Sequence, residues 1–148
     1  MTYQELINKL LEVAGKHQQV KSTGNGRQSE IDPADKKLYP TVWVVPISGR
    51  HTIKENQFTQ RWDISLLCGD LVHDNQLTEK NINLIHNKTY LILRDIIIKL
   101  HLEEDLKFEG DVTFEDFTDA FDGMTGWACR FTIRDSITPT ACDLPFNP

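Results

Sequence analysis

The five histidines are the side chains best suited to acid-base chemistry or metal binding near neutral pH. None stands at the HxxxH or HExxH spacing that would place two imidazoles on one side of a helix. The most polar neighbourhood surrounds His73, which lies between Asp70 and Asp74. In a loop before a helix, such residues more often make turns and caps. We therefore expect no metal ligand and no catalytic residue among the histidines.

Carboxylates and glycines carry no stronger motif. The acids between Glu115 and Asp122 offer the pair that a glycoside hydrolase uses, but so many acids on one segment more simply form a solvated face. Gly24 and Gly26 are close together but lack the remaining spacing of a phosphate-binding loop. No GxSxG motif is present. The sequence predicts neither an enzyme nor a bound cofactor.

The cysteines also favour a structural role. Cys68, Cys129 and Cys142 give an odd count without CxxC spacing, which argues against a disulfide framework and a thiolate zinc cluster. Cys68 and Cys129 fall on the apolar faces of predicted strands. We expect both to pack in the core as reduced thiols.

The overall charge limits the partners. The 148 residues have a formal net charge of -6, and an acidic surface repels the phosphates that dominate nucleic-acid affinity. A dedicated DNA-binding surface is therefore disfavoured, and the candidates for a local basic patch are few: Lys36, Lys37, Arg50 and Lys54. The most apolar stretch, 90–102, contains three charged residues and falls short of the run of about 20 apolar residues that a membrane span needs.

The conspicuous side chains are apolar and aromatic residues at loops and chain ends. Partly exposed aromatics anchor protein interfaces, although each of these could equally belong to the core, and for Trp43 the core is favoured. The candidate interface residues are Trp43, Arg50, His51, Phe121, Met124, Leu144 and Phe146.

Two helices are expected to position these residues. Thr2 and Glu5 fit a capping box, and apolar residues then recur at helical spacing until Gly15. A second, long helix begins near Thr78 and keeps an apolar stripe through Leu100.

Alternating segments predict the strands. They are a short strand at 19–22, a strand between Pro40 and Pro46 whose prolines mark its ends, a strand through Phe58 and Cys68, and two closing strands around Val112 and Trp127. Residues 47–55 are expected to form a turn, 23–37 a long mobile loop, and 138–148 an extended tail that folds back or reaches a neighbour. A bulge or bend is expected near Asp116.

These elements define an α+β fold. The predicted order is helix, three strands, long helix and two strands, in one domain covering residues 1–137. Each strand has one apolar face and each helix one apolar stripe. One antiparallel or mixed sheet of four to five strands, with the helices against one face, would bury them together.

Several features taken together suggest a family. They are the N-terminal amphipathic helix, the strand Tyr39-Pro40-Thr41-Val42-Trp43-Val44-Val45-Pro46, the strand from Gln57 to Asp70, and a long helix ending in Leu93-Arg94-Asp95-Ile96-Ile97. In this combination the chain resembles the tail-completion or tail-terminator proteins of tailed bacteriophages. The likeness consists of patterns of residue type between about Thr2 and Ile137, and it does not cover the 23–37 loop or the tail.

The resemblance implies a structural virion protein. Such a protein forms a ring at the head-tail junction or the end of the tail, a hexamer in the terminator family and a collar ring in related folds. Its partners are copies of itself and the neighbouring connector and tail proteins, it is assembled in the host cytoplasm, and no membrane is involved. DNA passes through the channel without specific binding, and an acidic wall would repel it.

Exposed sheet edges and loops are expected to pair between neighbouring subunits, because head-to-tail contacts close into rings. Two other classes stay open, since fold does not fix function. One is a small-ligand enzyme or binding domain with a pocket near His73 or the acidic turn. The other is a monomeric protein-binding adaptor.

Overall fold

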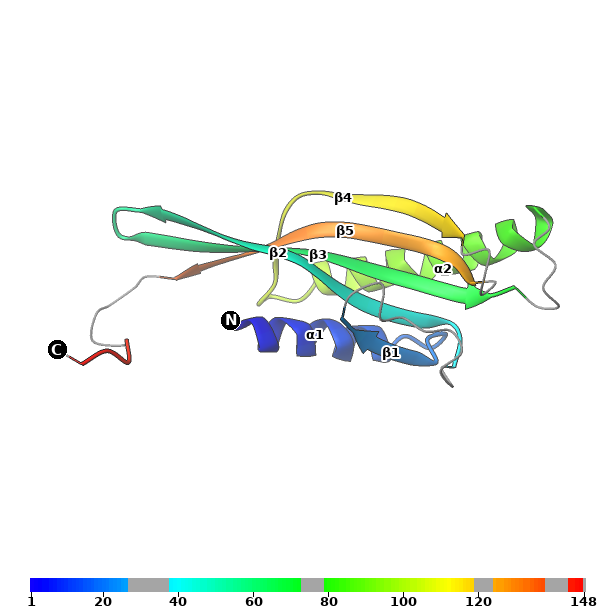
Figure 1. The fold of residues 1–148 in the computed structure, drawn as a ribbon, viewed down its shortest axis with the longest axis horizontal. Helices are drawn as coiled ribbons and strands as arrows, with labels where there is room; N and C mark the ends of the chain where they lie inside the picture. The colour runs from blue at the N-terminus through cyan, green and yellow to red at the C-terminus, as the bar shows by residue number, and fades with distance from the viewer. Residues whose placement is uncertain (27–37, 73–78, 119–123, 138–143, 148) are drawn as a thin grey trace.

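The structure is a computed structural model that describes residues 1–26, 38–72, 79–118, 124–137 and 144–147. It confirms the α+β class and the predicted order of elements (Figure 1). The elements are α1 (Tyr3–Gly15), β1 (Ser22–Asn25), β2 (Thr41–Lys54), β3 (Gln57–Leu71), α2 (Glu79–His101), β4 (Lys107–Thr118) and β5 (Met124–Ile137).

The five strands form one mixed sheet in the order β1-β2-β3-β5-β4. β1 runs parallel to β2, and every other neighbouring pair is antiparallel. The β2–β3 hairpin and the end of β5 extend well beyond both helices, on the left in Figure 1. The sheet is therefore covered by helices over only part of its length.

The core lies between the helices and one face of the sheet. Along α1 and α2 the buried apolar residues recur at three-and-four spacing, which is the stripe that the sequence predicts. On the sheet, paired positions such as Leu66 and Cys129 supply the facing layer. The predicted capping box starts α1, where Thr2 Oγ1 accepts from the Glu5 N–H at 3.2 Å and Glu5 Oε2 accepts from the Thr2 N–H at 2.7 Å.

The hairpin is longer than the sequence predicts. Pro46 does not end its strand, and most of the predicted turn at 47–55 is strand, because β2 continues to Lys54. The register shifts between Pro46 and Ser48, and this irregularity, on a stretch that is an edge of the sheet, accommodates a residue without an N–H. The connection is the two-residue loop Glu55-Asn56, in which Glu55 has a φ of 39°.

Two further boundaries are corrected. The first strand is Ser22–Asn25 rather than 19–22, so the segment taken as the start of the mobile loop is strand held by pairing with β2. In β4 the irregularity falls between Glu109 and Thr113, not near Asp116, and Gly110 there has a φ of 75°. The remainder of the predicted loop, 27–37, and the start of the tail, 138–143, lie outside the described residues.

Candidate functional site

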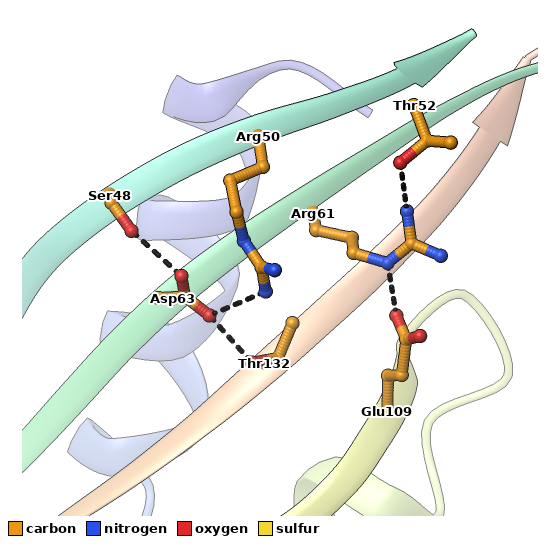
Figure 2. A network of polar contacts seen from close by, with 7 residues as sticks. All are labelled: Ser48, Arg50, Thr52, Arg61, Asp63, Glu109 and Thr132. Atoms are coloured by element: carbon orange, nitrogen blue, oxygen red, sulfur yellow. Dashed lines mark hydrogen bonds and ion pairs between the residues drawn. The ribbon is translucent and has the colours of Figure 1, made fainter.

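The face of the sheet opposite the helices carries a dense set of polar side chains. Along β3, Trp62 and Ile64 point to the core side, so Arg61 and Asp63 point to the other side. Figure 2 shows the polar side chains gathered on this face, with α1 behind the sheet. We call it the open face.

Strand register arranges this part of the open face in three parallel rows. The acidic row is Ser48, Asp63, Thr132 and Glu109; the basic row is Arg50, Arg61, Arg134 and Lys107; the hydroxyl row is Thr52, Thr59 and Ser136. Neighbours within each row lie directly opposite one another on adjacent strands. The basic row lies between the other two.

Asp63 is the centre of the acidic row. Its Oδ1 accepts from Thr132 Oγ1 at 2.6 Å and from Arg50 Nη2 at 3.3 Å, and its Oδ2 accepts from Ser48 Oγ at 2.7 Å (Figure 2). The hydrogen bonds from Thr132 and Ser48, followed by the nearby Arg50 charge, lower the pKa of Asp63. The carboxylate is thus held ionised beside the basic row.

Arg61 connects all three rows. Its Nε donates to Glu109 Oε2 at 2.6 Å and its Nη1 donates to Thr52 Oγ1 at 2.8 Å. The hydrogen bond from Arg61 is the main cause of a lowered pKa at Glu109. Two bonds in different directions fix the plane of the guanidinium, so its remaining donors have a defined orientation.

Four cations directly opposite one another across four strands repel, and such pairs destabilise a sheet. On one side of the basic row, the acidic row reduces this repulsion between cations, because Asp63 contacts Arg50 and Glu109 contacts Arg61. Beyond the other side of the row lies a hollow of about 170 Å³. Its lining residues are Thr52, Lys54, Gln57, Thr59, Arg61, Arg134 and Ser136.

The predicted interface residues are dispersed. Arg50 belongs to the basic row, whereas His51 follows it on the opposite side of β2, exposed and with its ring centroid 4.7 Å from that of Phe58. Leu144 and Phe146 are 50% and 80% exposed. Phe121 lies outside the described residues.

Trp43 and Met124 pack within the chain. The Trp43 ring lies against Gly24, where an added Cβ would come within 2.2 Å of it, and its Nε1 donates to the Gly26 carbonyl oxygen at 3.3 Å. Met124 is only 5% exposed and covers Gly69. Met124 is therefore buried in this conformation, whereas Trp43 packs against β1, is partly exposed and does not belong to the core cluster.

The two described cysteines are buried free thiols, which confirms that they pack in the core. Desolvation raises the pKa of Cys68, and it raises the pKa of Cys129 to about 12. Both thiols are therefore protonated at neutral pH and are poor nucleophiles.

Among the other polar groups singled out in the sequence, Asp70 has local partners. Asp70 accepts from Lys88 Nζ at 3.2 Å and from the Leu71 N–H at 2.8 Å. His73, Asp74 and the acids at 119–122 lie outside the described residues. Among the residues that the structure covers, no three His, Cys, Asp or Glu side chains are grouped to hold a metal ion.

The rows were not recognised in the sequence. Arg61 and Arg134 are far apart along the chain, and each looks like an ordinary polar position alternating with core residues. Only the pairing of β3 with β5 places them opposite one another. A search for basic clusters along the sequence finds Lys36, Lys37, Arg50 and Lys54, of which Arg50 belongs to the basic row and Lys54 lines the hollow, but it finds neither Arg61 nor Arg134.

No protein-family model matches the chain, and no curated protein matches it in sequence. In the described part of the chain, no helix is both long and apolar enough to cross a membrane.

Proposed function

We propose that this protein is a structural subunit of a tailed bacteriophage that forms a closed ring at the head-tail junction or at the end of the tail. It joins the connector to the tail and surrounds the channel through which DNA passes. The hexameric state and the virion location are those that the resemblance implies. The order of elements, α-β-β-β-α-β-β, supports the proposal because it is the order on which the resemblance rests.

The observation that carries the proposal is a sheet with two free edges. β1 pairs with β2 through Thr41–Val44, and from Val45 to Lys54 the outer edge of β2 has no partner strand among the described residues. β4 is the last strand at the opposite side, and its outer edge likewise faces no described strand. Two different free edges on one subunit favour head-to-tail contacts, which close into rings.

The projecting hairpin supplies an apolar contact at one of these edges. Ile53, next to the hairpin loop, is 72% exposed, and the hairpin extends past the helices that would otherwise cover it (Figure 1). An exposed β-branched residue on a free edge is a liability for a monomer and a contact for an assembled subunit. We infer that the hairpin reaches the adjacent subunit.

Mass measurement tests the proposal. Native mass spectrometry and negative-stain microscopy of the purified protein, alone and with connector and tail proteins, should show a closed ring, with six subunits for a hexamer. Ile53→Glu should abolish it. Leu84→Glu is the matched control, because Leu84 is 64% exposed on α2, away from the hairpin. A strictly monomeric protein that binds no virion protein would overturn the proposal.

A further inference from the structure

The basic row is compensated on one side only. Arg50 is paired with Asp63, and Arg61 with Glu109. For Lys54 and Arg134, neither a hydrogen bond nor a salt bridge to a carboxylate is found among the described residues. The side chains of Lys54, Arg61 and Arg134 line the same hollow.

We propose that this hollow binds a phosphate group. Its lining combines three cations with three hydroxyl groups and one side-chain amide, and it includes no carboxylate. Such a set offers charge-assisted and neutral hydrogen-bond donors to one tetrahedral oxyanion. The site is formed by three strands, β2, β3 and β5, so it exists only in the folded sheet.

Charge favours phosphate over a carboxylate. Lys54, Arg61 and Arg134 carry three positive charges, and Glu109 offsets about one of them through its contact with Arg61 and its attraction to Arg134. A phosphate monoester carries a charge of about −1.5 to −2 near pH 7, which matches the positive charge that remains on the three cations after Glu109 is counted. Its three oxygens also accept more hydrogen bonds than the two oxygens of a carboxylate. A carboxylate would leave part of the repulsion in the row uncompensated.

The site is also partly pre-organised. Arg61 is oriented by Glu109 and Thr52 before any ligand arrives, so less side-chain freedom is lost on binding. Thr59 and Ser136 lie directly opposite each other beyond Arg61 and Arg134. Their hydroxyls rotate to donate to whichever oxygens the ligand presents.

Two sources of phosphate fit this chemistry: a small phosphate monoester or inorganic phosphate, and the phosphodiester backbone of nucleic acid. A site of this kind reads no base sequence, because phosphate contacts position a nucleic acid without specifying it. It is thus compatible with DNA passing the protein without specific binding. The inference does not depend on the ring, since one chain supplies all of the lining residues.

The test is a titration of the folded protein with inorganic phosphate, followed through the backbone amide signals of residues 52, 59, 61, 134 and 136 in NMR spectra. Arg134→Gln should weaken binding at least about fivefold. Arg130→Gln is the matched control: Arg130 is exposed on the same strand and face but does not line the hollow, so binding should be unchanged.

A second measurement separates loss of binding from loss of folding. Arg134 lies opposite both Arg61 and Lys107, so Arg134→Gln relieves repulsion and should melt at the wild-type temperature or above it. If duplex DNA competes with phosphate for this site, the natural ligand is the phosphodiester backbone of nucleic acid. If phosphate binds and duplex DNA does not compete, the ligand is a small phosphate compound. The proposal fails if phosphate shifts none of these signals, if Arg130→Gln is as damaging as Arg134→Gln, or if a poly-glutamate peptide binds there in preference to phosphate.

Discussion

At the scale of single residues, Asp63 explains how this sheet tolerates a row of cations. Four positive side chains lie opposite one another, yet Asp63, which accepts from Ser48, Arg50 and Thr132, stands two residues further along β3 on the same face. The three donors hold its charge in place. The repulsion is thus reduced on one side, and the hollow on the other side has no carboxylate in its lining.

Asp63→Asn should lower the free energy of unfolding by about 1 kcal/mol at pH 7, because the ionised acceptor of the Thr132 and Ser48 hydroxyls and the charged partner of Arg50 are lost. The folded-state pKa of Asp63 is lowered, so the carboxylate stabilises the fold above its unfolded pKa of about 3.9, and this contribution disappears as the pH falls through the folded value. The difference between wild type and variant should therefore shrink below pH 4.

Urea unfolding at pH 7 and pH 3 measures this difference. Asp111→Asn, which removes an exposed carboxylate on β4 outside the acidic row, is the control and should change stability by no more than about 0.5 kcal/mol at either pH. A wild-type-to-Asp63→Asn difference that stays the same at both pH values would show that the charge of Asp63 contributes nothing.

At the scale of elements, the helices and the order of elements along the chain could be predicted, but the order of strands in the sheet and the extent of the hairpin could not. The capping box and three-and-four spacing are local signals, and both helices were found where they predict. Pro46 and Gly49 resemble the end of a strand and a turn because the sequence does not show the irregularity after Pro46 or the ring of Trp62 against Gly49. Long-range pairing decides those positions.

Long-range strand pairing is also the reason why the candidate site could not be predicted from the sequence. Its three rows depend on which residue of β5 lies opposite which residue of β3, and a shift of one residue would turn every side chain to the other face. Alternation along each strand predicts which residues face away from the core. It does not predict that like charges meet across strands, so the basic row could only be recognised in the structure.

Gly126 permits the close approach of β5 to β3, and its replacement should show this. A Cβ at Gly126 would lie 1.9 Å from the Cys68 carbonyl oxygen, a backbone atom that moves only if β3 and β5 separate. Gly126→Ala should therefore lower the free energy of unfolding by about 1–3 kcal/mol or more. Gly15→Ala is the control, because no atom lies within 4 Å of an added Cβ there and alanine favours the helix. Equal effects in denaturant unfolding would contradict this role.

At the scale of the whole molecule, charge and shape have opposite effects on self-association. The free edges and the exposed Ile53 favour contact between subunits, whereas a net charge of -6 on each subunit opposes it. The basic row is a local exception within an acidic chain. Assembly and phosphate binding should therefore respond differently to salt.

Raising NaCl from about 10 mM to 100 mM shortens the Debye length from about 30 Å to 10 Å and screens the repulsion between acidic subunits. Backbone pairing at the edges and the apolar contact of Ile53 are not weakened by this screening, so the assembled fraction in sedimentation velocity should rise. Phosphate binding, measured on the same samples, should weaken because its cations are screened too. Ile53→Glu should remain monomeric at both concentrations. Dissociation of the wild-type assembly by salt would instead mean that ion pairs, rather than strand edges and apolar contacts, hold the subunits together.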